Sequence, residues 1–279
     1  MTLPFLTQAQ APLTCEVSAT NEFGEHISVS IPAERALTVY VDKRELVTLM
    51  TLGAHPELLV LGYLLNQRLV KRAEEIESIT VDWDVGAAAV KTRHGIADVE
   101  EKTAKRVVTT GCGQGSVFGG LMDEVDQIKL PADASITQSQ LYALVNTIRL
   151  KETTYKSAGS VHACALFDST GSQPAMLIFV EDVGRHNAID TIAGWMSTNS
   201  EKLGSSNLVF YTTGRLTSEM VIKSAQMGVP IVISRSGITQ MGHEVAQMVG
   251  LCAIGRATNK RFLCYTHAQR LKLEPGLAA

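Results

Sequence analysis

Cys112 is flanked by glycine on both sides, in a segment that holds five glycines in twelve residues, TTGCGQGSVFGG at 109–120. The segment must be a loop, because glycine adopts backbone dihedrals that other residues avoid and lets a bulky reagent approach the sulfur. An accessible thiol on a loop is suited to attack another molecule or to pass a group to it. We therefore predict a chemical role for Cys112. The alternative is a free cysteine that merely falls in a loop, and Cys164 and Cys264, which lie in apolar stretches, are interpreted as structural.

The turn EDVGRHN, Glu181–Asn187, lies between an expected buried strand and an expected helix. Ligands bind at this edge of α/β sheets, and the N–H groups at the start of a helix attract anions. We predict that Arg185 and His186 hold a phosphate, and that Glu181 and Asp182 orient His186 or accept a hydrogen bond from a base. The alternative is a strand-end turn with an aspartate cap and a solvated arginine.

Two further segments carry cations at comparable places. Thr213–Thr217, TGRLT, follows the next expected strand, and Thr217 is a candidate N-cap of the helix after it. Arg256–Arg261, RATNKR, holds three cations near the C-terminus, and arginine forks suit pyrophosphate. If the two strand-end turns lie side by side, they form one anion site. A solvated loop is the alternative for Arg256–Arg261.

The histidines do not form a recognisable metal motif. His162, His243 and His267 are dispersed, and the chain lacks the H-x-E and P-C-x-x-C pair of zinc deaminases. A Walker motif and a G-x-S-x-G elbow are also missing. Metal catalysis and serine hydrolysis are therefore weakly supported, while a pairing of Cys112 with a histidine stays open.

Composition narrows the class of protein. The 279 residues are 45% hydrophobic and 19% charged, as in a globular protein. A net charge of -3, a pI near 6.2 and only 5% aromatic residues argue against a nucleic-acid partner. Five scattered cysteines without a CxxC indicate neither a disulfide framework nor a zinc site, and favour a reducing, cytoplasmic location. No apolar run reaches the ~18 residues of a membrane helix, so we expect no membrane partner.

Hydrophobic periodicity predicts an α/β fold, α+β overall. The first half is rich in strands, and strands alternate with helices in the second half. We divide the chain into an N-terminal arm (1–34), a β-rich domain that contains the Cys112 loop (35–135) and an α/β domain (136–279). Thr137 and Gln140 indicate a capping box for a helix through Arg149. After it, strands and helices alternate, which favours a layered domain with a largely parallel core. The strands that we expect are 27–31, 36–41, 45–51, 76–84, 87–93, 161–167, 175–180, 207–212, 231–234, 251–254 and 262–265, and the other helices are 56–65, 186–196, 218–227 and 242–249.

Several of these segments together resemble the formate dehydrogenase accessory sulfurtransferase family, FdhD. The resemblance runs from about Arg35 to Leu271, and EDVGRHNA is its most specific part. The N-terminal LGYLLNQRL at 61–69 is a weaker match. The other segments are TGCG at 110–113, GSVHACALFD at 159–168, VEDVGRHNAID at 180–190, TGRLTSEMVIKSAQMGVPI at 213–231 and YTHAQRL at 265–271.

The resemblance implies a sulfurtransferase that takes persulfide sulfur from a cysteine desulfurase and passes it to the bis-molybdopterin guanine dinucleotide cofactor of formate dehydrogenase or a related molybdoenzyme. It also implies a cytoplasmic homodimer whose C-terminal domain is a three-layer α/β domain like that of cytidine deaminases. Cys112 would carry the persulfide, and GDP would mimic part of the cofactor. The residues predicted to bind the cofactor are Arg256, Ala257, Thr258, Asn259, Lys260, Arg261, His162, Asp182, Gly184, Arg185, His186, Gly214 and Arg215.

The sequence departs from the family pattern in three places. The family usually has a second loop cysteine where this chain has Gly115, which excludes a relay between two loop cysteines. The segment at 234–239 is altered, and Lys260 replaces a usual glycine. A second hypothesis is therefore a binding module that carries the guanylated cofactor without chemistry. A cysteine hydrolase that acts on nucleotides is a third, for which the sequence supplies no identifiable base.

Overall fold

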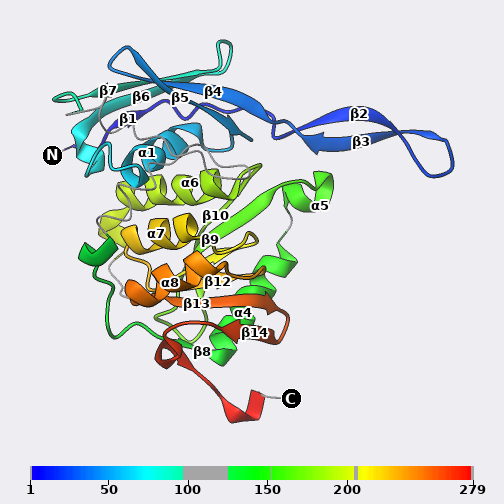
Figure 1. Cartoon of the computed structure of the whole chain (residues 1–279). Helices are drawn as coiled ribbons and strands as arrows, with labels where there is room; N and C mark the ends of the chain where they lie inside the picture. Colours follow the sequence, from blue (N-terminus) through cyan, green and yellow to red (C-terminus); the bar gives the residue numbers. More distant parts are fainter. Residues whose placement is uncertain (1, 97–124, 152, 204–206, 278–279) are drawn as a thin grey trace.

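A computed structural model of the 279-residue chain describes residues 2–96, 125–151, 153–203 and 207–277 (Figure 1). Cys112 and its glycine-rich segment therefore lie outside the described residues. Two larger sheets, one above the other in Figure 1, are separated by helices, and a long hairpin extends to one side.

The first sheet has five strands and is covered on one face by α1 (Pro56–Asn66). Its strands alternate buried and exposed residues, so one face of the sheet is apolar and packs on the helix. Pro56 opens α1, where its missing N–H costs no helical hydrogen bond. In spatial order the strands are β1 (Phe5–Leu6), β6 (Ile76–Asp82), β7 (Ala87–Thr92), β4 (Arg35–Val41) and β5 (Arg44–Thr51).

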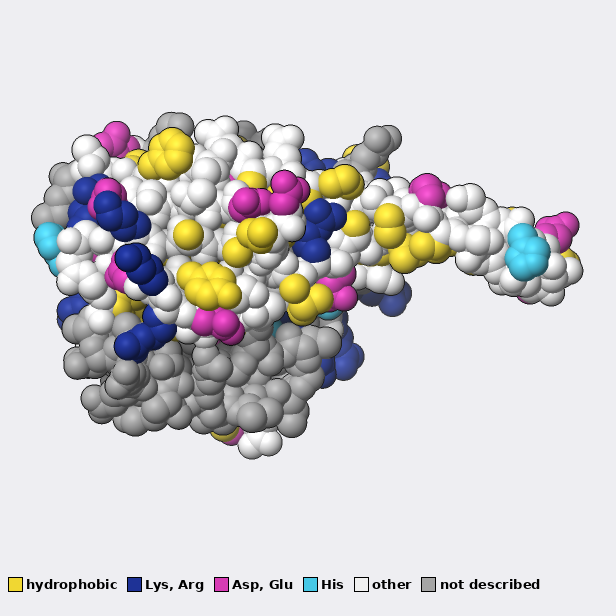
Figure 2. All heavy atoms as spheres, turned by 90° about the horizontal axis from the view of Figure 1, so that it is seen from above, with side chains coloured by type: hydrophobic (Ala, Val, Ile, Leu, Met, Phe, Trp, Pro, Cys, Tyr) yellow, Lys and Arg dark blue, Asp and Glu magenta, His cyan; other side chains and the backbone are white. Residues whose placement is uncertain are grey.

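The arm is the antiparallel hairpin of β2 (Thr14–Thr20) and β3 (His26–Pro32), which pair only with each other. It projects beyond the body of the protein, and Figure 2 shows hydrophobic side chains along it. Val17 faces Val29, and Ala19 faces Ile27, so one side of the hairpin is apolar. Strand β3 lies beside the short helix α5 (Thr154–Ala158).

The second sheet has six strands in the order β10, β9, β11, β12, β13, β14. Only β11–β12 and β12–β13 are parallel pairs, and the other three pairs are antiparallel. The prediction of a largely parallel core is therefore wrong beyond the three central strands, because β9 pairs antiparallel with β11 on one side and β14 pairs antiparallel with β13 on the other. The strands are β9 (His162–Asp168), β10 (Ala175–Asp182), β11 (Leu208–Thr212), β12 (Ile231–Ser234), β13 (Cys252–Thr258) and β14 (Arg261–Cys264).

Helices cover both faces of this sheet and make three layers, which confirms the predicted α/β class. On one face lies α4 (Gln138–Leu150), whose predicted capping box is present: Thr137 Oγ1 accepts from Gln140 N at 3.2 Å, and Gln140 Oε1 accepts from Thr137 N at 2.9 Å. Three helices pack on the other face: α6 (Arg185–Thr198), α7 (Ser218–Gln226) and α8 (Gln240–Met248).

Smaller elements complete the described chain. Strands β8 (Ile136–Thr137) and β15 (Leu271–Lys272) form a short parallel pair next to α4. Single 3-10 turns occur at Ala73–Glu75, Val125–Gln127, Ser200–Lys202, Ala268–Arg270 and Pro275–Leu277. No helix among the described residues is long and apolar enough to span a bilayer.

Helices α1 and α6 join the two sheets by packing backbone against backbone (Figure 1). A Cβ on Gly62 of α1 would overlap the carbonyl oxygen of Asp190 in α6, and one on Gly194 of α6 would overlap that of Leu58. Since real side chains never tolerate such overlaps, the two glycines are required for this close approach.

A buried charged network lies beside this crossing. Lys223 Nζ in α7 is 2.9 Å from Asp190 Oδ2 and 3.4 Å from Glu219 Oε1, and the Lys223 and Asp190 side chains are each 1% exposed. Asn66 Nδ2 in α1 donates to Asp190 Oδ1 at 2.6 Å. Burial lowers the pKa of Lys223, but the two carboxylates outweigh it and raise the pKa above its ordinary value. The network thus ties α1, α6 and α7 together through one ammonium group.

We expect Gly194→Ala to destabilise the protein by about 3 kcal/mol, because the new methyl group must push α1 away from α6. Urea unfolding measures the change. Gly171→Ala is the matched control, since its Cβ would meet only Gln173 O at 3.6 Å in a surface turn. Equal midpoints for both variants would show that the helices do not need this approach.

Candidate functional site

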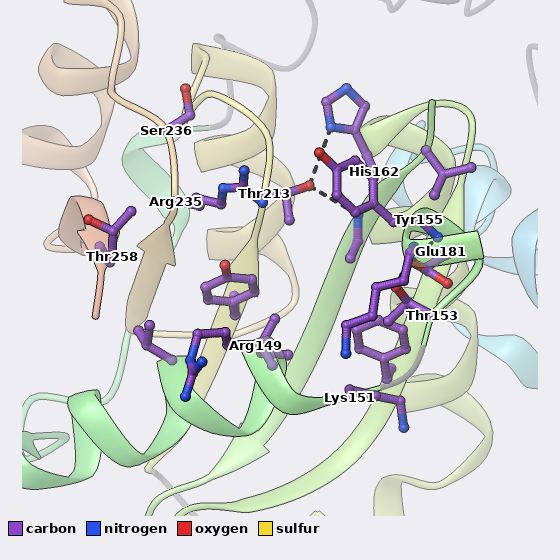
Figure 3. Close-up of a pocket in the computed structure, with 18 of the residues that line it drawn as sticks. Arg149, Lys151, Thr153, Tyr155, His162, Glu181, Thr213, Arg235, Ser236 and Thr258 are labelled. Atoms are coloured by element: carbon purple, nitrogen blue, oxygen red, sulfur yellow. Dashed lines mark hydrogen bonds between the residues drawn. The ribbon is translucent and has the colours of Figure 1, made fainter. Parts of the chain in front are cut away.

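A cavity of about 690 Å³ lies at the edge of the six-stranded sheet where β11, β12 and β13 end (Figure 3). Because β9 runs antiparallel to β11, its first residues reach the same edge. The end of α4 and the short helix α5 form the opposite wall. The lining comprises Val145, Ile148, Arg149, Lys151, Thr153, Tyr155, Lys156, Val161, His162, Ala163, Phe179, Glu181, Tyr211, Thr213, Arg235, Ser236, Ala257, Thr258 and Asn259.

The lining is strongly basic. It contains four cationic side chains, Arg149, Lys151, Lys156 and Arg235, and one carboxylate, Glu181. That carboxylate accepts hydrogen bonds from the backbone N–H groups at the start of α5, at 2.7 Å from Thr154 and 3.2 Å from Tyr155. Its charge is therefore committed to the helix start, and the cavity suits an anion.

Aromatic rings flank two of the cations. Lys151 Nζ lies 4.9 Å from the centre of the Phe179 ring, and Arg235 Cζ lies 5.9 Å from that of Tyr155. Tyr211 also lines the cavity, and burial raises the pKa of its hydroxyl to about 12. A cavity with flat apolar walls and cations can hold a phosphorylated ring compound by stacking and by charge.

His162 lines this cavity from the start of β9, and its ring lies beside Thr213 (Figure 3). Its Nδ1 is 3.4 Å from Thr213 Oγ1, which also accepts from Ala163 N at 3.0 Å. Burial lowers the pKa of His162, and the nearby Arg185 and Arg215 lower it further. The imidazole is therefore neutral at pH 7 and can accept or donate one hydrogen bond without adding charge.

The predicted segment Arg256–Arg261 is only partly in the cavity. Ala257, Thr258 and Asn259 line it, because they form the end of β13 and the start of the turn after it. Arg256, with φ +51°, is exposed and is not among the lining residues. Lys260 and Arg261 are also exposed and continue the turn into β14.

Asp182 is a structural residue of the junction between the sheets. Its Oδ2 accepts from Thr51 Oγ1 at 2.5 Å and from Leu52 N at 3.3 Å, and its Oδ1 accepts from Asn187 Nδ2 at 2.8 Å. Asn187 also donates to the carbonyl oxygen of Met50 at 2.6 Å. Asp182 is 3% exposed, and burial raises its pKa despite these donors. Its neighbours are therefore the end of β5 and the start of α6, and it does not line the cavity.

The two strand-end turns do lie side by side. A Cβ on Gly214 would come within 2.6 Å of Arg185 Cδ, so Gly214 leaves room for the Arg185 side chain. Gly184 takes the N-cap position of α6. Arg185 is buried and Arg215 is exposed, and both lie outside the cavity lining while acting on His162 through their charge. Thr217 takes the predicted N-cap position of α7, but its hydroxyl makes no capping hydrogen bond.

His186 belongs to the buried network. Its Nε2 is 3.3 Å from Glu219 Oε2, and both side chains are 8% exposed. Burial lowers the pKa of His186 to about 3, against the opposite pull of Glu219. We therefore describe His186 as a neutral residue beneath the sheet edge. It does not line the cavity.

The cavity contains functional candidates that the sequence did not reveal. Arg235 directly follows a predicted strand. Because ligands bind at the strand ends of α/β sheets, the argument that selected Asp182 also applies to Arg235. Arg149, Lys151 and Lys156 lie at the end of α4 and just after it, where no sequence motif marks them. The hydrogen bonds from the start of α5 to Glu181 join residues 26 and 27 positions apart, and no local sequence pattern predicts them. Among the described residues, no group of three or more His, Cys, Asp or Glu side chains could hold a metal ion.

Comparisons with known proteins place this architecture in a family. The sequence model described as FdhD/NarQ family matches residues 32–272. The chain belongs to the FdhD/NarQ family. This confirms the expected resemblance, and the match covers the second sheet, the first sheet apart from β1, and the basic cavity.

Relatives in the family carry informative names. A protein named "Sulfur carrier protein FdhD" from Bacillus subtilis is 32% identical over 245 residues, which cover 86% of this chain and 89% of that protein. One of the same name from Bacillus pumilus is 32% identical over 244 residues, or 85% and 88% of the two chains. A crystal structure described as a formate dehydrogenase accessory protein from Desulfotalea psychrophila has a TM-score of 0.72 at 23% identity. It covers 93% of this chain and 100% of its own, and it supports the fold.

The buried neutral His186 should make stability depend on pH. The unfolded chain takes up a proton near pH 6.5, whereas the folded protein does so only near pH 3. Stability should therefore fall as the pH drops through this window, by at most about 1.4 kcal/mol per pH unit for this one group.

His186→Gln removes the group that takes up this proton. The free energy of unfolding of the variant should therefore fall less steeply between pH 6.5 and pH 4, as measured by urea titration at each pH. His26→Gln, at an exposed position on the arm, is the control and should keep the original slope. An unchanged slope in His186→Gln would contradict the assignment, whatever the absolute stability of the variant.

Proposed function

We propose that this protein is a sulfur carrier that receives sulfur on Cys112 and passes it to a guanylated molybdenum cofactor bound at the basic cavity. The observation that supports the proposal most directly is the basic cavity at the carboxyl ends of β11–β13, with four cations and aromatic walls. The names of the relatives support the sulfur-carrying part.

The sulfur would come from the persulfide of a cysteine desulfurase. The Cys112 thiolate attacks the outer sulfur of that persulfide, so the sulfur–sulfur bond of the donor breaks as a new one forms on Cys112. The donor leaves as a thiolate, and Cys112 carries the terminal sulfur. With Gly115 in place of a second loop cysteine, no neighbouring thiol on the loop competes by closing a disulfide.

The acceptor would be the bis-molybdopterin guanine dinucleotide cofactor, which is the substrate of this second step. Its guanosine diphosphate part matches the cavity in chemistry: Arg149, Lys151, Lys156 and Arg235 offer donors to the pyrophosphate, and the Tyr155 and Phe179 rings offer surfaces for the base. Neutral His162 with Thr213 adds uncharged hydrogen-bonding groups to the lining.

A formate dehydrogenase or a related molybdoenzyme would receive the sulfurated cofactor, as the description of the structural relative suggests. We also propose that the protein works as a homodimer, because Ile27 and Ile31 are exposed on the β2–β3 arm, whose strands pair only with each other, and a two-stranded hairpin is marginally stable on its own. Sedimentation should then give twice the mass of the chain, and Val29→Lys on the arm should lower it.

A second function is favoured by one feature, the glycine at position 115. A chain with a single loop thiol could carry the guanylated cofactor without sulfur chemistry. Both functions need the cavity, and only the first needs Cys112, so the two experiments below separate them.

The cavity is tested by calorimetry with GDP as the probe. Arg235→Ala should weaken binding about tenfold or more, because it removes a charged hydrogen-bonding fork at the strand end. Lys91→Ala removes an exposed cation from the other sheet, where Lys91 pairs with Glu77 at 2.7 Å, and should leave binding unchanged.

Arg256→Ala and Arg261→Ala provide the comparison within the C-terminal hairpin. Since neither side chain lines the cavity, both should weaken GDP binding less than Arg235→Ala does. The opposite ranking would place the phosphates on the hairpin and contradict the cavity as the binding site.

The sulfur step is tested by intact-mass analysis after incubation with a cysteine desulfurase and free cysteine. The wild-type chain should gain one sulfur atom that reductant removes, and Cys112→Ala should gain none. Cys15→Ala, which removes a thiol that is exposed in the structure, should still gain it. A labile sulfur on Cys112→Ala would reject Cys112 as the carrier, and a molybdoenzyme matured normally by Cys112→Ala would favour the carrier without chemistry.

A further inference from the structure

Two thiols of the second sheet lie next to each other. Cys252 is in β13 and Cys264 in the neighbouring antiparallel strand β14, and their Sγ atoms are 3.8 Å apart. The register pairs Ile254 with Cys264, so Cys252 and Cys264 are diagonal neighbours on the same face of the sheet. The sulfurs are about 2 Å farther apart than in a disulfide, so the two sulfurs must move toward each other for a bond to form.

The two thiols differ in access. Cys252 is fully buried, whereas Cys264 is half-buried on β14, the last strand of the sheet. Cys264 Sγ also lies 3.5 Å from the carbonyl oxygen of Thr266. The hydrogen bond between the thiols lowers the pKa of Cys264, and the same bond together with burial raises that of Cys252. Cys264 is therefore accessible and easier to ionise, and Cys252 is buried on the neighbouring strand beside it.

We propose that Cys252 and Cys264 form a redox-active dithiol, in which Cys264 reacts first with a low-molecular-weight disulfide and Cys252 then closes an intramolecular disulfide. The proposal is independent of sulfur transfer on Cys112. Cys164 provides the contrast within the same sheet: it is fully buried, and burial raises the pKa of its thiol to about 12. Its Sγ interacts with Thr212 Oγ1 at 3.3 Å.

The chemistry balances with the disulfide as oxidant. The Cys264 thiolate attacks one sulfur of the small disulfide, forms a mixed disulfide and releases one small thiolate. Cys252 loses its proton to solvent and attacks Cys264 Sγ, which forms the internal bond and releases the second small thiolate. Two protein thiols are oxidised, and one small disulfide is reduced to two small thiols.

The position of the pair connects it to the cavity. Strand β13 leads from Cys252 to Ala257, Thr258 and Asn259, which line the cavity, and the turn after Thr258 returns the chain to Cys264. An internal disulfide would close a ring that contains this whole hairpin. Oxidation would thus restrain the segment that forms one wall of the cavity.

The test uses the full chain with Cys15→Ser and Cys112→Ser, which leaves Cys164, Cys252 and Cys264. After incubation with oxidised glutathione under native conditions, the intact mass should fall by two hydrogen atoms. Peptide mapping should link Cys252 to Cys264, and dithiothreitol should reverse the change. Hydrogen exchange of residues 256–261 should become slower in the oxidised protein.

Three variants in the same background separate the roles. Cys252→Ala should retain one glutathione on Cys264, because the resolving thiol is gone. Cys264→Ala should show no change in mass, since Cys252 is buried, and Cys164→Ala should still lose two hydrogen atoms. Circular dichroism checks that each variant is folded.

The chain with only Cys15→Ser and Cys112→Ser decides the outcome, even if one of the three further variants fails to fold. Two free thiols at Cys252 and Cys264 after excess oxidised glutathione, or a link that forms only in denaturant, would overturn the proposal. A link between Cys164 and either residue would overturn it as well. Because Cys112 is absent from this background, these results do not depend on the sulfur-carrying function.

Discussion

One buried ammonium group underlies the arrangement of this protein. Lys223 is enclosed by two carboxylates, and Asn66, from the helix of the other sheet, satisfies the far oxygen of Asp190. A buried charge is tolerated only when its partners are complete, so the helices that supply them must meet in one geometry. The two glycines of the α1–α6 crossing make that geometry sterically available. The basic cavity depends on it indirectly, since α6 and α7 begin at the same sheet edge at which the cavity opens.

In this arrangement, most residues of EDVGRHN, the most specific segment of the family resemblance, have structural roles. Of the residues in EDVGRHN, Asp182 and Asn187 hold the end of β5, and His186 contacts Glu219 below the sheet edge. Only Glu181 reaches the cavity, where it anchors the start of α5. Charged and polar residues in a loop after a strand look like ligands in a sequence. In this fold most of them satisfy one another and the backbone of a distant segment, and the groups that face the cavity come from less specific stretches.

Local pattern predicted the regular elements well, because alternation and helical spacing are set by which face is buried. The hairpin of β4 and β5, the helix α1 and the capping box of α4 are examples. Strand β1, with two residues, and α5, with five, are too short to show a period. In the site, Thr213 and Arg235 come directly after predicted strands, where ligands bind in α/β sheets, so sequence reasoning can identify them. The partnership of Asp182 with Thr51 is not, because the two are 131 residues apart in the chain and no local pattern encodes the contact.

The close packing of α1 on α6 also fixes the two points, Ile96 and Val125, between which the segment that contains Cys112 is attached. The chain leaves the first sheet at Ile96, which packs on that sheet's core, and returns at Val125, which is buried in the core of the second. Because these two anchors belong to parts that the helix crossing holds together, their separation is fixed. Cys112 is sixteen residues from one anchor and thirteen from the other. Both ends of the segment that contains Cys112 are therefore attached to one unit, and the basic cavity belongs to that same unit.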